Sequence, residues 1–229
     1  MALHTYDDVE QGTEEWLALR RGIVTASTVG QLLTATGRPA NNDTSRRLTL
    51  ALVAERITGE SEPTYMNDDM LRGHLEEPIA RDFYAEHFAD GELVTTTGFM
   101  VNDGYGWQLG FSPDGLVGDH GLIEIKAPRA KAHLATFLAD AVPDRHMAQI
   151  QAGLLVSGRE WCDFVSWFGG QPPFVKRVYA QPKWTEAIVN AVADFEQVAE
   201  DMTHRYDLAT RGLPATERRI ELTDEIKVA

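Results

Sequence analysis

Three residues in the middle of the sequence have side chains suited to metal binding and acid–base chemistry. Asp114 lies in the turn-forming segment Ser-Pro-Asp-Gly, and Glu124 and Lys126 follow in the run Gly-Leu-Ile-Glu-Ile-Lys. Two carboxylates at close range repel each other unless a cation lies between them. Because hard oxygen ligands favour Mg²⁺ or Mn²⁺ over zinc, Asp114 and Glu124 predict a site for one of these ions.

The same cluster suits hydrolysis of a phosphodiester bond. A backbone carbonyl such as that of Ile125 would add a third ligand and leave positions open for water and a phosphate. Lys126 would hold the attacking water or help to deprotonate it, and would stabilise negative charge in the transition state. We expect two ions per site, of which one activates water and the other stabilises the leaving oxygen.

A strand entered by a short hairpin would position this cluster. Side chains alternate between the two faces of a strand, so Leu122, Glu124 and Lys126 would share one face. Ile123 and Ile125 would then point into the opposite, packed face. An exposed ion pair on a solvated strand is the alternative, but central strands rarely carry two charged residues without a functional reason.

Hydrophobic periodicity predicts the surrounding elements. Helices are expected over residues 26–33, 44–57, 68–89, 132–140, 144–157 and 184–209. Strands are expected over residues 93–101, 107–111, 121–126, 161–168 and 174–180. Pro78 should kink the third helix or mark its start. This order predicts the α/β (α+β) class, with one mixed central β-sheet flanked by helices on both faces.

The composition is that of an ordinary globular protein. The 229 residues, 43% of them hydrophobic, favour one domain with a core over about 12–210 and a charged tail at 212–229. No run of 18 apolar residues and no secretory signal is evident, and the one cysteine excludes cysteine-ligated iron–sulfur and Cys₄ zinc sites. We therefore expect a cytoplasmic protein without membrane contact.

The net charge of −14 argues against binding nucleic acid over the whole surface. The basic residues nevertheless form small clusters, at Arg20–Arg21, Arg46–Arg47, Arg129 with Lys131, and Lys176–Arg177. A local basic channel in an acidic molecule therefore remains compatible with the sequence, and each bound divalent ion would reverse the field of its carboxylates.

The helix expected after residue 143 carries further polar residues. Residues three apart are neighbours on a helix, so His146 and Gln149 would share a face. An apolar stripe of Met147, Ile150 and Leu154 would point to the core. Gln149 would then hydrogen-bond metal-bound water or phosphate, whereas a solvent-facing glutamine is the alternative.

Two other segments hold candidate residues. Glu77 would supply a further carboxylate for water-mediated metal binding, or would be a surface glutamate on a charged helix. Thr25 or Ser27 lies near the start of a helix, where backbone N–H groups attract anions, and Arg20 or Arg21 would add a forked phosphate contact. Helix capping by Thr25 or Ser27 is the simpler explanation, and both can hold together.

Five ordered motifs give the chain a family resemblance. They are W-x-x-x-R-x-G-x-x-T-A-S (16–27), G-x-x-x-E (73–77), S-P-D-G-L (112–116), G-L-I-E-I-K-A-P (121–128) and M-A-Q-x-Q (147–151). With these motifs the chain resembles the lambda exonuclease or YqaJ-type viral recombinase family, within the PD-(D/E)xK nuclease superfamily. The resemblance implies a restriction-endonuclease-like core.

The resemblance also implies roles for individual residues. Asp114 and Glu124 would ligate the metal together with the carbonyl of Ile125, and Lys126 would be the catalytic lysine. Glu77 and Gln149 match secondary active-site positions. Arg20, Ser27 and Ser112 match a pocket that grips the 5′-phosphate of DNA. His146 stands where the phage exonuclease of the family has a tyrosine.

The expected activity is that of a Mg²⁺-dependent exonuclease that degrades linear double-stranded DNA in the 5′→3′ direction. The resemblance implies a phage-type recombination enzyme, a ring-shaped homotrimer around the DNA, and transfer of the 3′ overhang to a single-strand annealing protein. An endonuclease or repair nuclease on the same fold is one alternative. A catalytically inert module that binds DNA ends is another, although the intact Asp114, Glu124 and Lys126 argue against it.

Overall fold

The strands form two separate sheets. The computed structural model describes residues 3–34, 36–61 and 67–217. The first sheet has the order β1-β4-β5-β2, with these strands at Leu3–Tyr6, Phe99–Asn102, Leu109–Phe111 and Val24–Thr25. The second has the order β3-β6-β7-β8-β9, at Val94–Thr95, Gly115–Val117, Gly121–Lys126, Trp161–Ser166 and Phe174–Tyr179. Both are mixed sheets, because β2 runs parallel to β5 and β7 runs parallel to β8.

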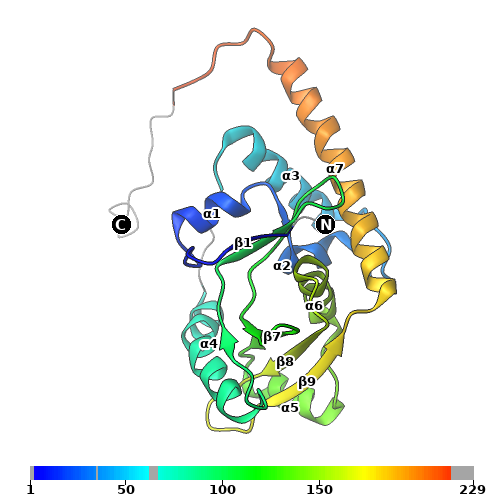
Figure 1. The fold of residues 1–229 in the computed structure, drawn as a ribbon. Coiled ribbons are helices and arrows are strands. Elements are labelled where there is room, and N and C mark those ends of the chain that lie inside the picture. The colour runs from blue at the N-terminus through cyan, green and yellow to red at the C-terminus, as the bar shows by residue number, and fades with distance from the viewer. Residues whose placement is uncertain (1–2, 35, 62–66, 218–229) are drawn as a thin grey trace.

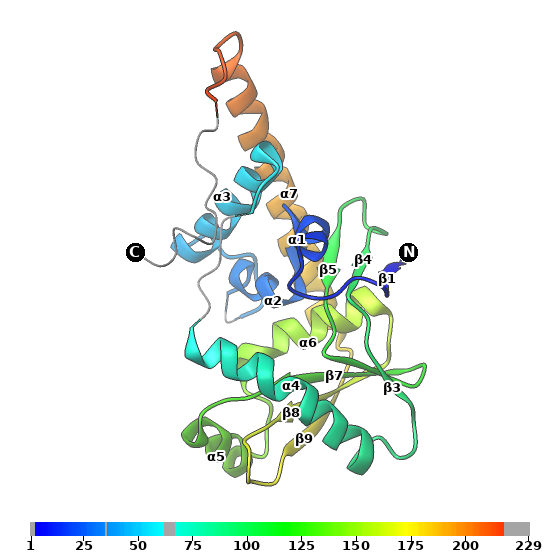
Figure 2. The same cartoon turned by 90° about the vertical axis from the view of Figure 1, so that its left-hand side faces the viewer.

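Helices cover both sheets (Figures 1 and 2). They are α1 (Glu14–Arg20), α2 (Ala26–Val29), the 3₁₀ helix η1 (Gly30–Leu32), α3 (Asp43–Thr58), α4 (Asp68–His87), α5 (Ala130–Ala139), α6 (Asp144–Ser157) and α7 (Pro182–Thr210). Among the described residues, no helix has the length and apolar character needed to span a membrane.

Helix α6 lies between the two sheets, as Figure 2 shows, and contacts β4 and β5 on one side and β8 on the other. Its buried residues Ile150 and Leu154 belong to the larger apolar core, together with Leu122 of β7 and Phe164 of β8. The stripe predicted for this helix therefore does face the core.

Helix α4 covers the other face of the five-stranded sheet. Ala80 and Tyr84 pack there against Ile123 and Ile125 of β7 and form a second, smaller core. The helix begins where the side chain of Asn67 accepts a hydrogen bond from the backbone N–H of Met70, at 2.9 Å. Because Leu122 lies in one core and Ile123 and Ile125 in the other, β7 is packed on both faces, and the predicted alternation of its side chains holds.

The predicted fold class is confirmed, with two differences in detail. The strands divide between two sheets instead of one, because the strand expected over 93–101 is broken into β3 and β4, which pair in different sheets. Helix α4 runs through Pro78 without ending, so this proline does not mark a helix start. Four elements that the sequence did not predict are β1, α1, β2 and β6. The charged tail predicted at 212–229 lies largely outside the described residues.

Candidate active site

A hairpin of β6 and β7 brings the two carboxylates of the predicted site together. The strands pair antiparallel with Gly115 opposite Ile123. Asp114 directly precedes β6, so continuing this register by one residue places it opposite Glu124. Its Oδ2 accepts a hydrogen bond from the backbone N–H of Ile125 at 2.6 Å, which holds the carboxylate against β7.

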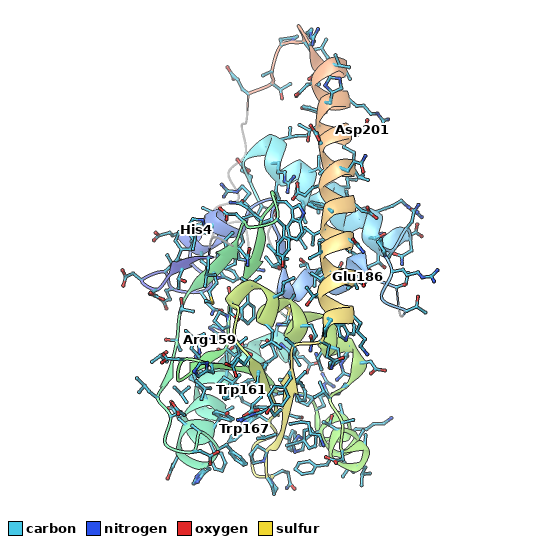
Figure 3. The ribbon with its side chains drawn as sticks, turned by 45° about the vertical axis from the view of Figure 1, so that its right-hand side comes forward. His4, Arg159, Trp161, Trp167, Glu186 and Asp201 are labelled. Atoms are coloured by element: carbon cyan, nitrogen blue, oxygen red, sulfur yellow. The ribbon has the colours of Figure 1, made fainter. Side chains whose placement is uncertain are left out.

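The turn of this hairpin depends on local backbone geometry. Gly118 has a φ of 48°, in the left-handed region that favours glycine. The guanidinium of Arg159, which Figure 3 labels, holds this turn, because its Nη1 donates to the carbonyl oxygens of Gly118 and Gly121, both at 2.8 Å. The hairpin that positions Asp114 and Glu124 is thereby held at its far end.

The carboxylate of Glu124 is buried beside the ammonium of Lys126. Glu124 is 1% exposed, and the Nζ of Lys126 forms an ion pair with its Oε1. Neither carboxylate oxygen accepts a hydrogen bond from any other described residue. Burial raises the pKa of Glu124 to about 7, although Lys126 opposes this shift. A buried carboxylate with so few partners is costly unless a cation neutralises it.

Lys126 stays charged in this setting. Burial alone would lower its pKa, but the carboxylates of Glu124 and Asp114 outweigh that effect and raise the pKa above its usual range. Without a bound metal ion, Lys126 is therefore an ammonium at neutral pH. Its chemistry fits stabilisation of negative charge better than removal of a proton from water.

Helix α4 adds a third carboxylate to the cluster. Burial, and then the charge of Asp114, raise the pKa of Glu77 to about 7. The Oε1 of Glu77 accepts a hydrogen bond from Nη2 of Arg81 at 3.1 Å, one turn along the helix. Glu77 therefore lies in the electrostatic field of the site, while its role as a water-mediated metal ligand stays a prediction.

These residues fit a hard divalent cation. The supporting observation is the buried carboxylate of Glu124, whose oxygens have no donor besides Lys126 among the described residues. Its neighbour Asp114 is held by a single backbone N–H. No described group of three His, Cys, Asp or Glu side chains forms a ready metal site. An ion would therefore need a backbone oxygen in addition to these two side chains, as expected for the carbonyl of Ile125.

On the other side of β7, α6 brings His146 near the cluster. Its ring stacks on Phe164, with 5.4 Å between centroids, and Phe164 pairs with Glu124 across the parallel strands. Burial, and then the charge of Lys126, lower the pKa of His146 to about 4, so its imidazole is neutral at pH 7. Gln149 lies one turn further along and is half-buried. The structure thus places His146 within the electrostatic field of Lys126, with Gln149 next along the helix.

The residues of the predicted phosphate pocket are only partly brought together. The indole Nε1 of Trp16 donates to Oγ of Ser112 at 2.9 Å. The guanidinium carbon of Arg20 lies 3.8 Å from the centre of the Trp16 ring, and burial lowers the pKa of Arg20. Trp16 thus links Arg20 to Ser112, a role that the sequence reasoning missed. The signal for it was present, since the W-x-x-x-R spacing makes the two residues neighbours on a helix.

Thr25 and Ser27 lie at the start of α2. Their hydroxyl oxygens are 3.0 Å apart, and Thr25 also forms a capping box with Thr28. The capping predicted for Thr25 is therefore present. With only four residues, α2 has a weak dipole, so an anion here would depend on hydroxyl groups and on Arg20 more than on the helix. No hydrogen bond among the described residues joins Ser27 to Arg20 or Ser112.

Together these features define a mixed α/β protein with a candidate carboxylate–carboxylate–lysine site on a buried central strand. A family model described as the YqaJ-like viral recombinase domain matches residues 15–160, which is more than half of the chain. The chain therefore belongs to the YqaJ-like viral recombinase family, and the resemblance seen in the sequence is confirmed.

Solved structures show the same fold. An alkaline exonuclease (LHK-Exo) from Laribacter hongkongensis is 33% identical over 88% of this chain and 100% of that chain, with a TM-score of 0.78. Its complex with dAMP gives a TM-score of 0.79. A phage related exonuclease from Haemophilus somnus 129PT is 11% identical over 80% of this chain and 96% of that chain, with a TM-score of 0.64, and shows the fold alone. The comparison with curated proteins gives no match.

Proposed function

We propose that this protein is a metal-dependent DNA exonuclease that degrades linear double-stranded DNA from its 5′ ends and leaves 3′ overhangs. The observation that carries the proposal is the buried carboxylate of Glu124, paired with Lys126 and facing Asp114 across a hairpin. Family membership and the similarity to an alkaline exonuclease support the same activity.

Asp114 and Glu124 would hold Mg²⁺ or Mn²⁺, together with the carbonyl of Ile125. One or two such ions would polarise the scissile phosphate and supply a nucleophilic water at neutral pH. The ammonium of Lys126 lies against Glu124 and would stabilise the negative charge that develops on the phosphate. Glu77 and Gln149 would orient water from opposite sides of the cluster.

The neutral imidazole of His146 suits a position beside Lys126. A protonated histidine there would repel the ammonium, whereas the neutral ring can hydrogen-bond a phosphate-bound water without adding charge. In this proposal His146 takes the place of the tyrosine found in the phage enzyme of the family, as a group that positions substrate. Either ring nitrogen can serve, since the tautomer is set by its partner.

The end-binding pocket would determine the direction of cleavage. Arg20, stacked on Trp16, and the hydroxyl of Ser112 would bind a terminal 5′-phosphate. Ser112 lies two residues before Asp114, so a phosphate held there would place the adjacent phosphodiester near the metal site. Ser27 and Thr25 would extend the pocket. Recognition through phosphate and shape implies weak sequence preference.

The remaining parts of the proposal concern assembly. We propose a ring-shaped homotrimer with DNA in its channel, working in the cytoplasm and passing its 3′ overhang to a single-strand annealing protein. A ring reconciles the net charge of −14 with DNA binding, because an acidic exterior can coexist with a basic lumen.

A direct test compares linear and closed circular DNA with Mg²⁺ present. We expect release of mononucleotides from linear duplex, faster with a 5′-phosphate than with a 5′-hydroxyl, and no cleavage of the closed circle. Equal cleavage of both substrates would favour an endonuclease or repair nuclease. Absence of hydrolysis with both Mg²⁺ and Mn²⁺, but retained binding of ends, would favour the inert module. Sizing the protein in solution tests the trimer at the same time.

A further inference from the structure

Helix α4 is fixed to the sheet on both sides of Glu77. On the N-terminal side, Nη2 of Arg72 donates to the carbonyl oxygen of Ala127 at 2.8 Å, and Ala127 directly follows Lys126. On the C-terminal side, the hydroxyl of Tyr84 donates to Oδ2 of Asp163 at 2.6 Å. The helix that carries the third carboxylate is therefore tied at two places to the strands of the candidate site.

The second attachment is a buried network. Tyr84 is 1% exposed, and the side chain of Asp163 is 4% exposed. Arg177 on β9 forms a forked ion pair with Asp163, with Nε to Oδ1 and Nη2 to Oδ2 both at 2.8 Å. The guanidinium of Arg177 also lies 3.5 Å from the centre of the Trp161 ring, which Figure 3 labels. Asp163 thus receives donors on both oxygens, from α4 and from β9.

Helix geometry connects this network to Glu77. Residues seven apart lie two turns apart on the same face, so Glu77 and Tyr84 face the sheet together. Pro78 has no N–H and leaves one backbone hydrogen bond of the helix unmade, in the turn that carries Glu77. That turn is therefore less constrained by the helix itself. Its position depends more on the attachments at Arg72 and Tyr84.

A purely stabilising role does not account for this network well. A buried ion pair is often no more stabilising than apolar residues of the same volume, because desolvation offsets the attraction between the charges. The network instead fixes the orientation of the Asp163 side chain, since the forked pair with Arg177 and the hydroxyl of Tyr84 hold both of its carboxylate oxygens. Burial and Asp163 also raise the pKa of Tyr84, so its hydroxyl remains a donor.

We propose that Tyr84, Asp163 and Arg177 are positioning residues that hold Glu77 at the cluster of Asp114, Glu124 and Lys126. They touch neither substrate nor metal and act through the rotation of α4. The inference rests on the proposed function, because it assigns Glu77 to the metal site. It predicts that loosening the network changes metal use and turnover without changing DNA-end binding.

The test is a double-mutant cycle between Tyr84→Phe and Glu77→Gln. Tyr84→Phe keeps the ring in the core and removes only the hydroxyl. We expect it to lower kcat about tenfold and to raise the Mg²⁺ concentration for half-maximal activity, with KM for linear duplex unchanged, as for other residues that orient metal ligands. In the Glu77→Gln background, adding Tyr84→Phe should change kcat by less than about twofold.

A second readout does not require hydrolysis. The midpoint of thermal unfolding, measured at pH 8 as the Mn²⁺ concentration is raised, reports ion binding directly. The titration midpoint should move to higher Mn²⁺ in Tyr84→Phe, but not further when Tyr84→Phe is added to Glu77→Gln. If a water replaces the lost hydroxyl in Tyr84→Phe and hides its effect, Asp163→Asn should still shift the Mn²⁺ titration midpoint. This substitution keeps the shape of the side chain and weakens the forked pair. Thr49→Val is the control, because it removes another buried hydroxyl, bonded to the carbonyl of Ser45 on α3.

The outcomes separate the two proposals. If the unmodified protein hydrolyses no DNA, the proposed function fails, and the Mn²⁺ titration still decides the positioning role. If Glu77→Gln leaves both turnover and Mn²⁺ binding unchanged, Glu77 has no place at the site and the inference is wrong. If the changes in kcat caused by Tyr84→Phe and Glu77→Gln simply multiply in the double variant, the network is merely structural. The same conclusion holds if Thr49→Val has the same effect as Tyr84→Phe.

Discussion

Asp114 accepts a hydrogen bond from the backbone N–H of Ile125 at 2.6 Å, so the residue before β6 is fixed to the strand that presents Glu124 and Lys126. This contact holds the carboxylate of Asp114 opposite that of Glu124, although the two residues are separated in the sequence. Burial raises the pKa of both carboxyl groups, and a bound cation would relieve the repulsion between their charged forms.

Replacing Lys126 by alanine should strongly slow hydrolysis while DNA ends still bind. The ammonium is expected to act on charge that develops only in the transition state, so its loss should lower kcat by about 10²–10³. Turnover of linear duplex and binding of the same duplex in Ca²⁺ would be measured in parallel. Lys176→Ala, at a half-exposed lysine paired with Asp140, is the control. Unchanged kcat in Lys126→Ala would contradict the assigned role.

Asp114→Asn should remove the stabilisation that Mg²⁺ gives to the protein. The amide keeps the shape of the side chain but loses the charge that would hold the ion. In the unmodified protein, Mg²⁺ at about 100 times its Kd should add about 2.7 kcal/mol to the free energy of unfolding. Thermal unfolding with Mg²⁺ and with a chelator measures the difference. Asp103→Asn, in a surface pair with His4, should retain the full metal effect.

Glu124→Gln should alter how metal-free stability depends on pH. The folded-state pKa of Glu124 is raised to about 7, from an unfolded value of 4.5, so the folded state binds the proton more tightly between these values. Its stabilising contribution is therefore present at low pH and is lost as pH rises through about 7. Relative to Glu124→Gln, the unmodified protein should lose on the order of 2 kcal/mol between pH 5 and pH 8.

Denaturant unfolding of both proteins, with a chelator present, tests this difference. Comparing the two proteins matters because His146 has the opposite dependence. Its pKa is lowered to about 4 in the folded state, so its contribution makes the protein more stable as pH rises toward 6.5. That contribution is common to both proteins and largely cancels. If the difference in free energy of unfolding between the two proteins does not change from pH 5 to pH 8, Glu124 is ionised throughout this range.

Arg20→Gln should reduce the preference for a 5′-phosphate. Arg20 lies over the Trp16 ring, and Trp16 donates to Ser112, so the pocket presents one cation and one hydroxyl group. We expect loss of a charge-assisted contact to reduce the advantage of 5′-phosphorylated over 5′-hydroxyl duplex about tenfold. Initial rates on the two duplexes provide the measurement. Arg46→Gln, at an exposed arginine of α3, should leave the ratio unchanged, and an equal loss there would refute the pocket.

Much of the fold was predictable where the signal is local. All six predicted helices are present, although the one expected over 26–33 is divided into α2 and the 3₁₀ helix η1, and the run that contains Glu124 and Lys126 forms β7 as expected. The strands β1, β2 and β6 were missed, because segments of two to four residues are too short for periodicity to identify. Helix α1 was missed although Thr13 caps it by accepting a hydrogen bond from the N–H of Trp16.

The sequence by itself predicted which side chains form the candidate site, since the spacing of Asp114, Glu124 and Lys126 requires only a hairpin and a strand. Tertiary structure alone decided the division into two sheets and the partners of Tyr84 and Trp16. Tyr84 meets Asp163 across 79 positions, and Trp16 meets Ser112 across 96. Such contacts depend on how distant segments pack, and local periodicity carries no information about that packing.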